Sequence, residues 1–169
     1  GRSHRFVPKA TIVAAGAYER PWPVPGWTLP GVMTTGAAQT LWRTARRLPG
    51  RRVLIAGNGP LNLQLAAELI EGGAEVVAVI EAATRPTLGQ IGALTTMFAA
   101  APNLVRDGFR YHRSRRAAGT RMIYSHVVAS VTKRADGLSV DLAPGGRFEA
   151  DILCLGYGFE PSNELLRLL

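Results

Sequence analysis

Residues 51–82 carry the feature that most constrains the fold of this chain. The stretch begins with "RRVLIAG", a short continuous apolar run of the kind found in parallel strands buried on both faces. The loop "GNGPLN" follows, then an amphipathic pattern over residues 60–73, then a second apolar run, "AEVVAVIEA". Strand, glycine-rich turn, helix and strand within about thirty residues predict a right-handed βαβ unit. The sequence therefore predicts an α/β fold built on a parallel sheet.

Patterns before this unit extend the α/β prediction. The apolar residues 9–17 predict a buried strand, and the proline-rich residues 18–32 predict a connector without regular structure. Small and apolar residues at helical spacing then predict a helix over residues 34–48, with Thr34 or Thr35 as its N-cap.

The residues after the unit change from a helical to an alternating pattern. Residues 87–119 have a helical pattern that Pro102 interrupts. From residue 121 onward, four segments predict strands, namely "RMIYS", "VVASVTKR", "LSVDLA" and "FEADILCLG". A turn at Asp136 and Gly137 joins two of them. A small antiparallel excursion is therefore expected to follow the parallel core.

Composition and charge exclude several classes of protein. With 169 residues, 47% of them hydrophobic, the chain can bury one sizeable core. The net charge of +8 comes mostly from dispersed arginines without an aromatic stacking motif or zinc-ligand spacing, which favours a solvated basic surface over a nucleic-acid face. No apolar run reaches the roughly 18 residues of a membrane span, and the first residues lack the order of a signal peptide. We expect a cytoplasmic protein without a nucleic-acid partner or a membrane span.

The loop "GNGPLN" is the main candidate binding site. At a strand-to-helix turn, free helix N–H groups and the helix dipole both point at an anion, so a pyrophosphate can bind there. Gly57 would make the sharp turn, and Gly59 would let the backbone approach the phosphates. Asn62 stands where a third glycine would permit close helix packing, so its presence bears on packing more than on phosphate contact. The predicted pyrophosphate site consists of Gly57, Asn58, Gly59, Pro60 and Leu61.

Glu81 supplies the second half of the predicted site. It ends the second apolar run, 24 residues after Gly57, and an acid at about this distance accepts hydrogen bonds from ribose hydroxyls and repels a 2′-phosphate. This favours NAD over NADP, although Arg85 would weaken the preference. The motif recognises an ADP moiety, so NAD, ADP, ATP and FAD all remain open. The alternative is a tight structural turn, with Glu81 at an exposed strand end.

Three longer stretches resemble one family. The chain contains "AAGAYERP" followed by "PGWTLPGV", then "GNGPL" where "GSGPL" is the common form, and finally "GYGFEP" of the form GxGxxP. In these stretches it resembles the two-dinucleotide-domain flavoproteins of the pyridine nucleotide-disulfide oxidoreductase superfamily. The likeness covers nearly the whole chain. It is strongest to the FAD-dependent subunits related to opine oxidase, hydrogen cyanide synthase, hydroxyproline dehydrogenase and the sarcosine oxidase alpha subunit.

This resemblance implies a division of the chain and a set of cofactors. Residues 1–30 would be an FAD-domain strand and connector, residues 31–149 an NAD(P)-binding-type Rossmann domain, and residues 150–169 the return to the FAD domain. Gly16 and Gly156 would lie where the chain crosses between the two domains. The family's first glycine motif, which binds FAD, is missing here. The resemblance therefore implies FAD in an intact parent of which this chain is a piece, and NAD or another adenine nucleotide at the glycine-rich loop.

The remaining reactive side chains suggest no catalytic or metal site. A single cysteine, Cys154, lies within an apolar run and is expected in the core. The three histidines, isolated from any candidate nucleophile or metal ligand, are expected in loops or at the surface. Tyr18, Trp22 and Trp27 of the connector are expected to cover a seam between domains.

The sequence thus predicts part of a flavin-dependent oxidoreductase. The resemblance implies that the parent oxidises the C–N bond of an amino acid, imino acid or opine and passes a hydride to FAD. The expected partners are a small-molecule substrate, the remaining FAD-domain segments and a second oxidoreductase subunit. Two alternatives stay open. One is a structural or regulatory adenine-nucleotide site without hydride transfer, and the other is a nucleic-acid-binding module that uses the basic surface.

Overall fold

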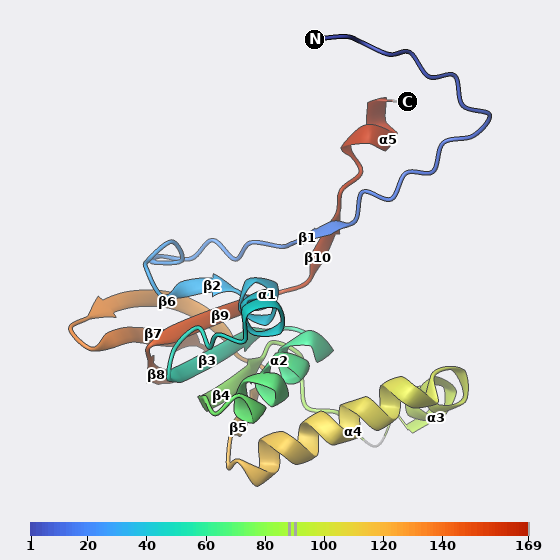
Figure 1. Cartoon of the computed structure of the whole chain (residues 1–169). Helices are drawn as coiled ribbons and strands as arrows, with labels where there is room; N and C mark the ends of the chain where they lie inside the picture. Colours follow the sequence, from blue (N-terminus) through green and yellow to red (C-terminus); the bar gives the residue numbers. More distant parts are fainter. Residues whose placement is uncertain (88, 90, 169) are drawn as a thin grey trace.

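A five-stranded parallel sheet forms the centre of the molecule (Figure 1). The computed structural model describes residues 1–87, 89 and 91–168. The strands follow the order β2-β9-β3-β4-β5, and every neighbouring pair is parallel. Their bounds are β2 Val32–Thr34, β3 Arg52–Gly57, β4 Glu75–Glu81, β5 Arg121–Tyr124 and β9 Ile152–Gly156. This confirms the predicted α/β fold with a parallel sheet.

Helices α1 and α2 pack on one face of this sheet, α4 packs against α2, and α3 packs against α4. Their bounds are α1 Thr35–Ala45, α2 Pro60–Glu71, α3 Ile91–Ala100 and α4 Pro102–Ala117. The N-cap of α1 is Thr34, whose Oγ1 accepts a hydrogen bond from the Ala37 N–H at 3.2 Å, so the first of the two predicted caps is confirmed. The predicted break at Pro102 is also confirmed, because this proline is the first residue of α4.

A three-stranded antiparallel sheet covers the other face. It consists of β6 (Val127–Arg134), β7 (Gly137–Ala143) and β8 (Arg147–Ala150). Successive side chains of β3 point to opposite faces of the sheet, toward the helices on one face and the antiparallel sheet on the other. Val53 and Ile55 pack in the cluster with α2, while Leu54 and Ala56 pack with the antiparallel strands. The central sheet is therefore buried on both faces, as its continuous apolar runs predict.

Two predicted strands occupy different places from those expected. "RMIYS" was expected in the antiparallel excursion, but β5 forms the edge of the parallel sheet beside β4. "FEADILCLG" is two strands, because Asp151 turns the chain from β8 into β9. The Asp151 carboxylate accepts a hydrogen bond from the Arg52 N–H at 2.8 Å, and its own N–H donates to the Arg52 carbonyl at 2.9 Å. Residues 152–156, assigned above to the return segment, therefore belong to the central sheet.

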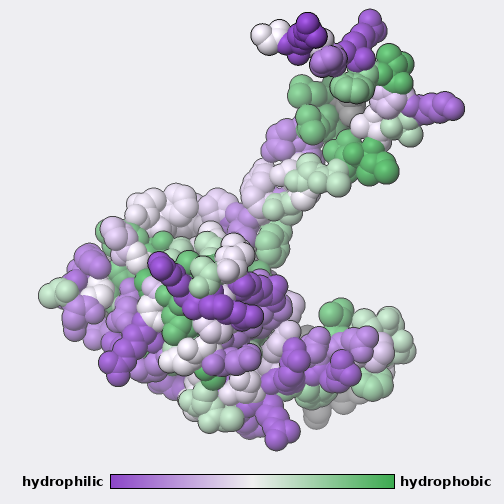
Figure 2. All heavy atoms as spheres, in the orientation of Figure 1, coloured by the Kyte–Doolittle hydropathy of each residue, from purple (hydrophilic) through white to green (hydrophobic). Residues whose placement is uncertain are grey.

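The two ends of the chain meet in a thin projecting ribbon. We call residues 1–19 and 158–168 the terminal ribbon, and residues 31–156 the sheet body. In the ribbon, β1 (Ala17–Glu19) pairs antiparallel with β10 (Phe159–Pro161), and the short α5 (Glu164–Leu168) follows (Figure 1). Figure 2 shows apolar surface gathered on this projection, where Ile12, Leu165 and Leu168 are exposed.

The predicted buried strand over residues 9–17 is wrong for this chain. Residues 9–16 have no regular secondary structure and are almost entirely exposed. A strand needs hydrogen-bond partners along its length and cover for its apolar side chains. In the described chain, residues 17–19 have a strand partner, and the segment before them does not.

Candidate functional site

The carboxyl ends of β3, β4 and β9 meet beneath the glycine-rich loop. Gly57 and Gly156 are register partners on β3 and β9. A Cβ atom added to Gly57 would lie 1.9 Å from the Gly156 carbonyl oxygen, so only glycine fits there. The same carbonyl accepts a hydrogen bond from the Asn58 N–H at 2.8 Å. The first half of the loop is therefore held tightly against β9.

Gly59 has the opposite environment. It precedes α2 as the N-cap residue, with φ of 105°, and no described atom lies within 4 Å of a Cβ added to it. Its conformation favours glycine, and the space beside it is open to a ligand. Pro60 has no N–H to offer, so Leu61 carries the first backbone donor of the helix. The loop thus presents a helix N-terminus next to unfilled space, as a pyrophosphate site requires.

Asn62 fastens this loop to two other elements. It is almost fully buried, and its Nδ2 donates to the Gly156 carbonyl at 3.0 Å. The hydroxyl of Thr35, the first residue of α1, donates to the Asn62 Oδ1 at 2.9 Å. The side chain that replaces the third glycine therefore holds α1, α2 and β9 together. Sequence inspection predicted an effect on packing, but it did not identify Thr35 as a partner.

Glu81 lies beside the loop and is buried, with 6% of its surface exposed. One carboxylate oxygen accepts a hydrogen bond from the Gly59 N–H at 3.2 Å, and the other accepts one from the Ala83 N–H at 3.1 Å. The structure therefore brings the two halves of the predicted motif into direct contact. It contradicts the alternative in which Glu81 is an exposed strand end. Arg85, by contrast, is exposed.

Gly16 stands apart from this cluster. It precedes β1 in the terminal ribbon, and its carbonyl accepts a hydrogen bond from the Ser162 N–H at 2.9 Å. Glu19, at the end of β1, does reach the sheet body. Both of its carboxylate oxygens accept the Gly36 N–H in the first turn of α1, at 2.8 and 2.9 Å. This contact joins residues 17 positions apart, and no local pattern in the sequence identified it.

The connector packs on the sheet body through Trp22. Its ring stacks on Tyr157 with centroids 4.1 Å apart, and its indole N–H donates to the Val128 carbonyl at 2.9 Å. The Tyr157 hydroxyl in turn accepts the Val128 N–H at 3.1 Å. The prediction for Trp22 was a seam between domains. In the described residues its ring packs instead between the connector, β6 and the residue after β9.

The remaining reactive groups form no second centre in the described residues. Cys154 is fully buried in β9, and burial raises the pKa of its thiol to about 12, with a further contribution from Glu19. That thiol is therefore neutral near pH 7, as expected of a core cysteine. Among the described residues no cluster of His, Cys, Asp and Glu could hold a metal ion. In the same residues, no helix is long and apolar enough to span a membrane.

The parallel sheet, the glycine-rich turn and the helix that follows it define a Rossmann-like fold. The family model described as pyridine nucleotide-disulphide oxidoreductase matches residues 1–168. The chain belongs to this family of oxidoreductases, whose members are FAD- and NAD(P)-dependent flavoproteins.

Curated relatives agree with this assignment. Hydrogen cyanide synthase subunit HcnB of Pseudomonas protegens is 34% identical over 91% of this chain and 34% of its own length. An opine oxidase subunit of Agrobacterium tumefaciens is 43% identical over 54% of this chain and 18% of its own length. The chain thus spans from about a fifth to a third of these relatives.

Solved structures share the fold. A ferredoxin reductase from Rhodopseudomonas palustris matches with a TM-score of 0.63 and 24% identity, over 90% of this chain and 35% of that chain. A water-forming NADH oxidase from Lactobacillus brevis, bound to NADH, matches with a TM-score of 0.61 and 21% identity, over 90% of this chain and 31% of that chain.

Proposed function

We propose that the loop from Gly57 to Leu61 binds the pyrophosphate of NAD, with Glu81 at the adenosine ribose. The observation that carries this proposal is the open space beside Gly59 at the N-terminus of α2. The Gly59 N–H donates a hydrogen bond to the Glu81 carboxylate at 3.2 Å, so this carboxylate lies at the same end of the helix. Ribose hydroxyls can donate to that carboxylate, and its negative charge disfavours a 2′-phosphate. The Gly156 carbonyl fixes the position of the loop, because it accepts a hydrogen bond from the Asn58 N–H. We therefore propose that the ligand is NAD rather than NADP.

Titration with NADH and NADPH tests this proposal. We expect NADH to bind more tightly than NADPH. Glu81→Gln should weaken NADH binding by roughly tenfold to a hundredfold, because a charge-assisted hydrogen bond is worth about 1.5–3 kcal/mol. The same variant should reduce the difference in affinity between NADH and NADPH. Glu75→Gln is a matched control, because Glu75 is exposed at the other end of the same strand.

Three results would contradict the proposal. In the first, Glu81→Gln and Glu75→Gln weaken NADH binding equally. In the second, the unaltered chain does not bind NADH. In the third, Gly59→Val leaves NADH binding unchanged. Thermal melts of each variant separate a loss of binding from a loss of fold.

In the intact protein, we propose that this module works beside an FAD domain. The names of two groups of relatives, opine oxidase and sarcosine oxidase, support oxidation of a C–N bond in an amino acid, imino acid or opine. Several relatives are named as subunits, which supports a partner in the form of a second oxidoreductase subunit. The apolar terminal ribbon would pair with the remaining FAD-domain segments.

Flavin reduction distinguishes this role from that of a structural or regulatory nucleotide site. We expect NADH to bleach the flavin absorbance of the full-length, flavin-loaded protein under anaerobic conditions. The amine substrate should bleach the same flavin. If NADH binds but the flavin stays oxidised, the nucleotide has a structural or regulatory role, and the proposed role in hydride transfer is wrong.

A further inference from the structure

α3 and α4 form an arm with uncovered apolar side chains. Met97, Phe98, Leu104 and Phe109 expose 46%, 60%, 67% and 65% of their surfaces. The arm extends beyond the sheet on the side of α2 (Figure 1), and apolar surface is visible on its outer part (Figure 2). Large apolar and aromatic side chains of this kind are typical anchors at protein interfaces.

Three of these side chains, Met97, Leu104 and Phe109, border a groove rather than a flat patch. The groove has a volume of about 720 Å³ and lies between the start of α2 and the two helices of the arm. Leu61, Met97, Leu104 and Phe109 are among its lining residues, and most of the others are also apolar. A groove between helices accepts the apolar face of an amphipathic helix.

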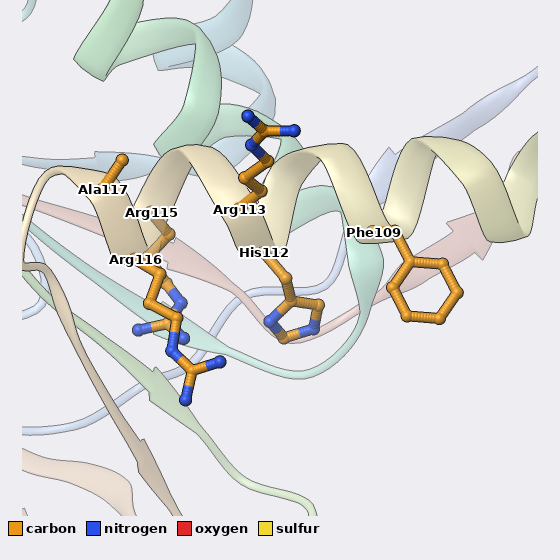
Figure 3. A pocket seen from close by; sticks show the side chains of 6 residues that line it. All are labelled: Phe109, His112, Arg113, Arg115, Arg116 and Ala117. Carbon is orange, nitrogen blue, oxygen red and sulfur yellow. The ribbon is translucent and has the colours of Figure 1, made fainter.

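A basic hollow continues the groove along α4. It has a volume of about 610 Å³, and Phe109 and His112 line both it and the groove. Figure 3 shows Phe109, His112 and Arg116 on one side of the helix. Burial lowers the pKa of His112, and the charges of Arg115 and Arg116 act in the same direction, so the imidazole is neutral near pH 7. The positive charge of the hollow therefore comes from arginine.

The charge of α4 decides which occupant fits. The helix carries five arginines and one acidic residue, Asp107, which already pairs with Arg110 at 3.5 Å. A second copy of this chain would bring like charges together, which is unfavourable. A nucleic acid would satisfy the arginines but leave the apolar groove unfilled, and a membrane surface would not enter a concave groove. An acidic amphipathic helix satisfies both parts of the surface.

We propose that the groove and the hollow together dock an acidic amphipathic helix of another protein. Its apolar face would contact Leu104 and Phe109, and its carboxylates would pair with arginines of α4 such as Arg116. The inference rests on the proposed role of the chain within a multi-subunit oxidoreductase, and it places the contact on the arm, away from the terminal ribbon.

Fluorescence anisotropy with a defined probe tests the proposal. The probe is a labelled 18-residue helical peptide with leucine at positions i, i+3, i+4 and i+7 and glutamate on the flanking positions. A second peptide carries lysine in place of every glutamate. We expect the acidic peptide to bind the 169-residue chain at least about tenfold more tightly than the basic one, with affinity falling as salt increases.

Two variants and one control locate the binding surface. Phe109→Ser and Arg116→Glu, both at exposed positions, should each weaken binding by about tenfold. Arg134→Glu, an equal change of charge on β6, should change it less than about twofold. NADH titration of the same variants should be unaffected, which separates failure of this inference from failure of the nucleotide proposal.

The inference is overturned if the two peptides bind equally, or if Arg134→Glu weakens binding as much as Arg116→Glu does. It is also overturned if the arm binds phosphatidylglycerol vesicles or single-stranded DNA through Phe109 and Arg116 but does not bind the acidic peptide.

Discussion

The sheet body and the terminal ribbon have similar apolar sequences but opposite environments. In the body, "RRVLIAG" becomes β3 and its apolar side chains are fully buried. In the ribbon, "KATIVAAG" has no regular secondary structure, and Ile12 is 93% exposed. β3 has strands on both sides and a packed layer on each face, whereas residues 9–16 have neither. An apolar run therefore predicts a strand only where the fold supplies neighbours.

The largest expected difference between the two regions is in thiol reactivity. In a Ser3→Cys variant, alkylation at pH 8 should label the introduced thiol of the ribbon at the rate of a free cysteine. Cys154 should react about a thousandfold more slowly, because only the thiolate reacts and burial raises its pKa to about 12. Peptide mass spectrometry measures both sites in one molecule. Similar rates would show that β9 opens readily, and the comparison would fail.

Truncation of leucine should give the next largest difference. Leu153→Ala removes a fully buried side chain of β9 and should cost about 3–5 kcal/mol of unfolding free energy. Leu166→Ala in α5, where the side chain is 60% exposed, should change it by less than about 0.5 kcal/mol. Urea denaturation followed by circular dichroism measures both values. Equal costs would mean that the ribbon unfolds together with the body.

Glycine replacement should give the smallest of the three differences. Gly57→Ala places a methyl group against the Gly156 carbonyl and should cost about 1–3 kcal/mol, read as a lower Tm. Gly16→Ala meets no described atom within 4 Å. An alanine at φ of 71° is strained, but this strain would affect only the terminal ribbon, so the Tm of the sheet body should not change. A Tm lowered by Gly16→Ala would contradict the independence of the two regions.

The parts of the fold that the sequence predicts are those with local causes. The strand, loop and helix from Arg52 to Glu71 depend on apolar periodicity, on two glycines and on Pro60 at the first helical position. Contact between the loop and Glu81 could also be predicted, because neighbouring parallel strands end at the same edge of a sheet.

The parts that could not be predicted depend on contacts between distant segments. No local pattern shows that Glu19 meets the N-terminus of α1 at Gly36, or that Asn62 reaches the carbonyl of Gly156, 94 positions away. For the same reason the sequence could not show that β5 joins the parallel sheet. Its alternating pattern is typical of any strand with one covered face, whichever sheet it enters.

The position of β9 has a consequence for how the protein is made. β9 lies between β2 and β3, and it is the last strand of the central sheet in chain order. In the described sheet, β2 pairs only with β9, so it emerges from the ribosome long before its partner strand. The edge of β3 that pairs with β9 stays open for as long. The central sheet is therefore completed only after Gly156 has been synthesised, and until then the nascent chain exposes strand edges that can pair with other chains.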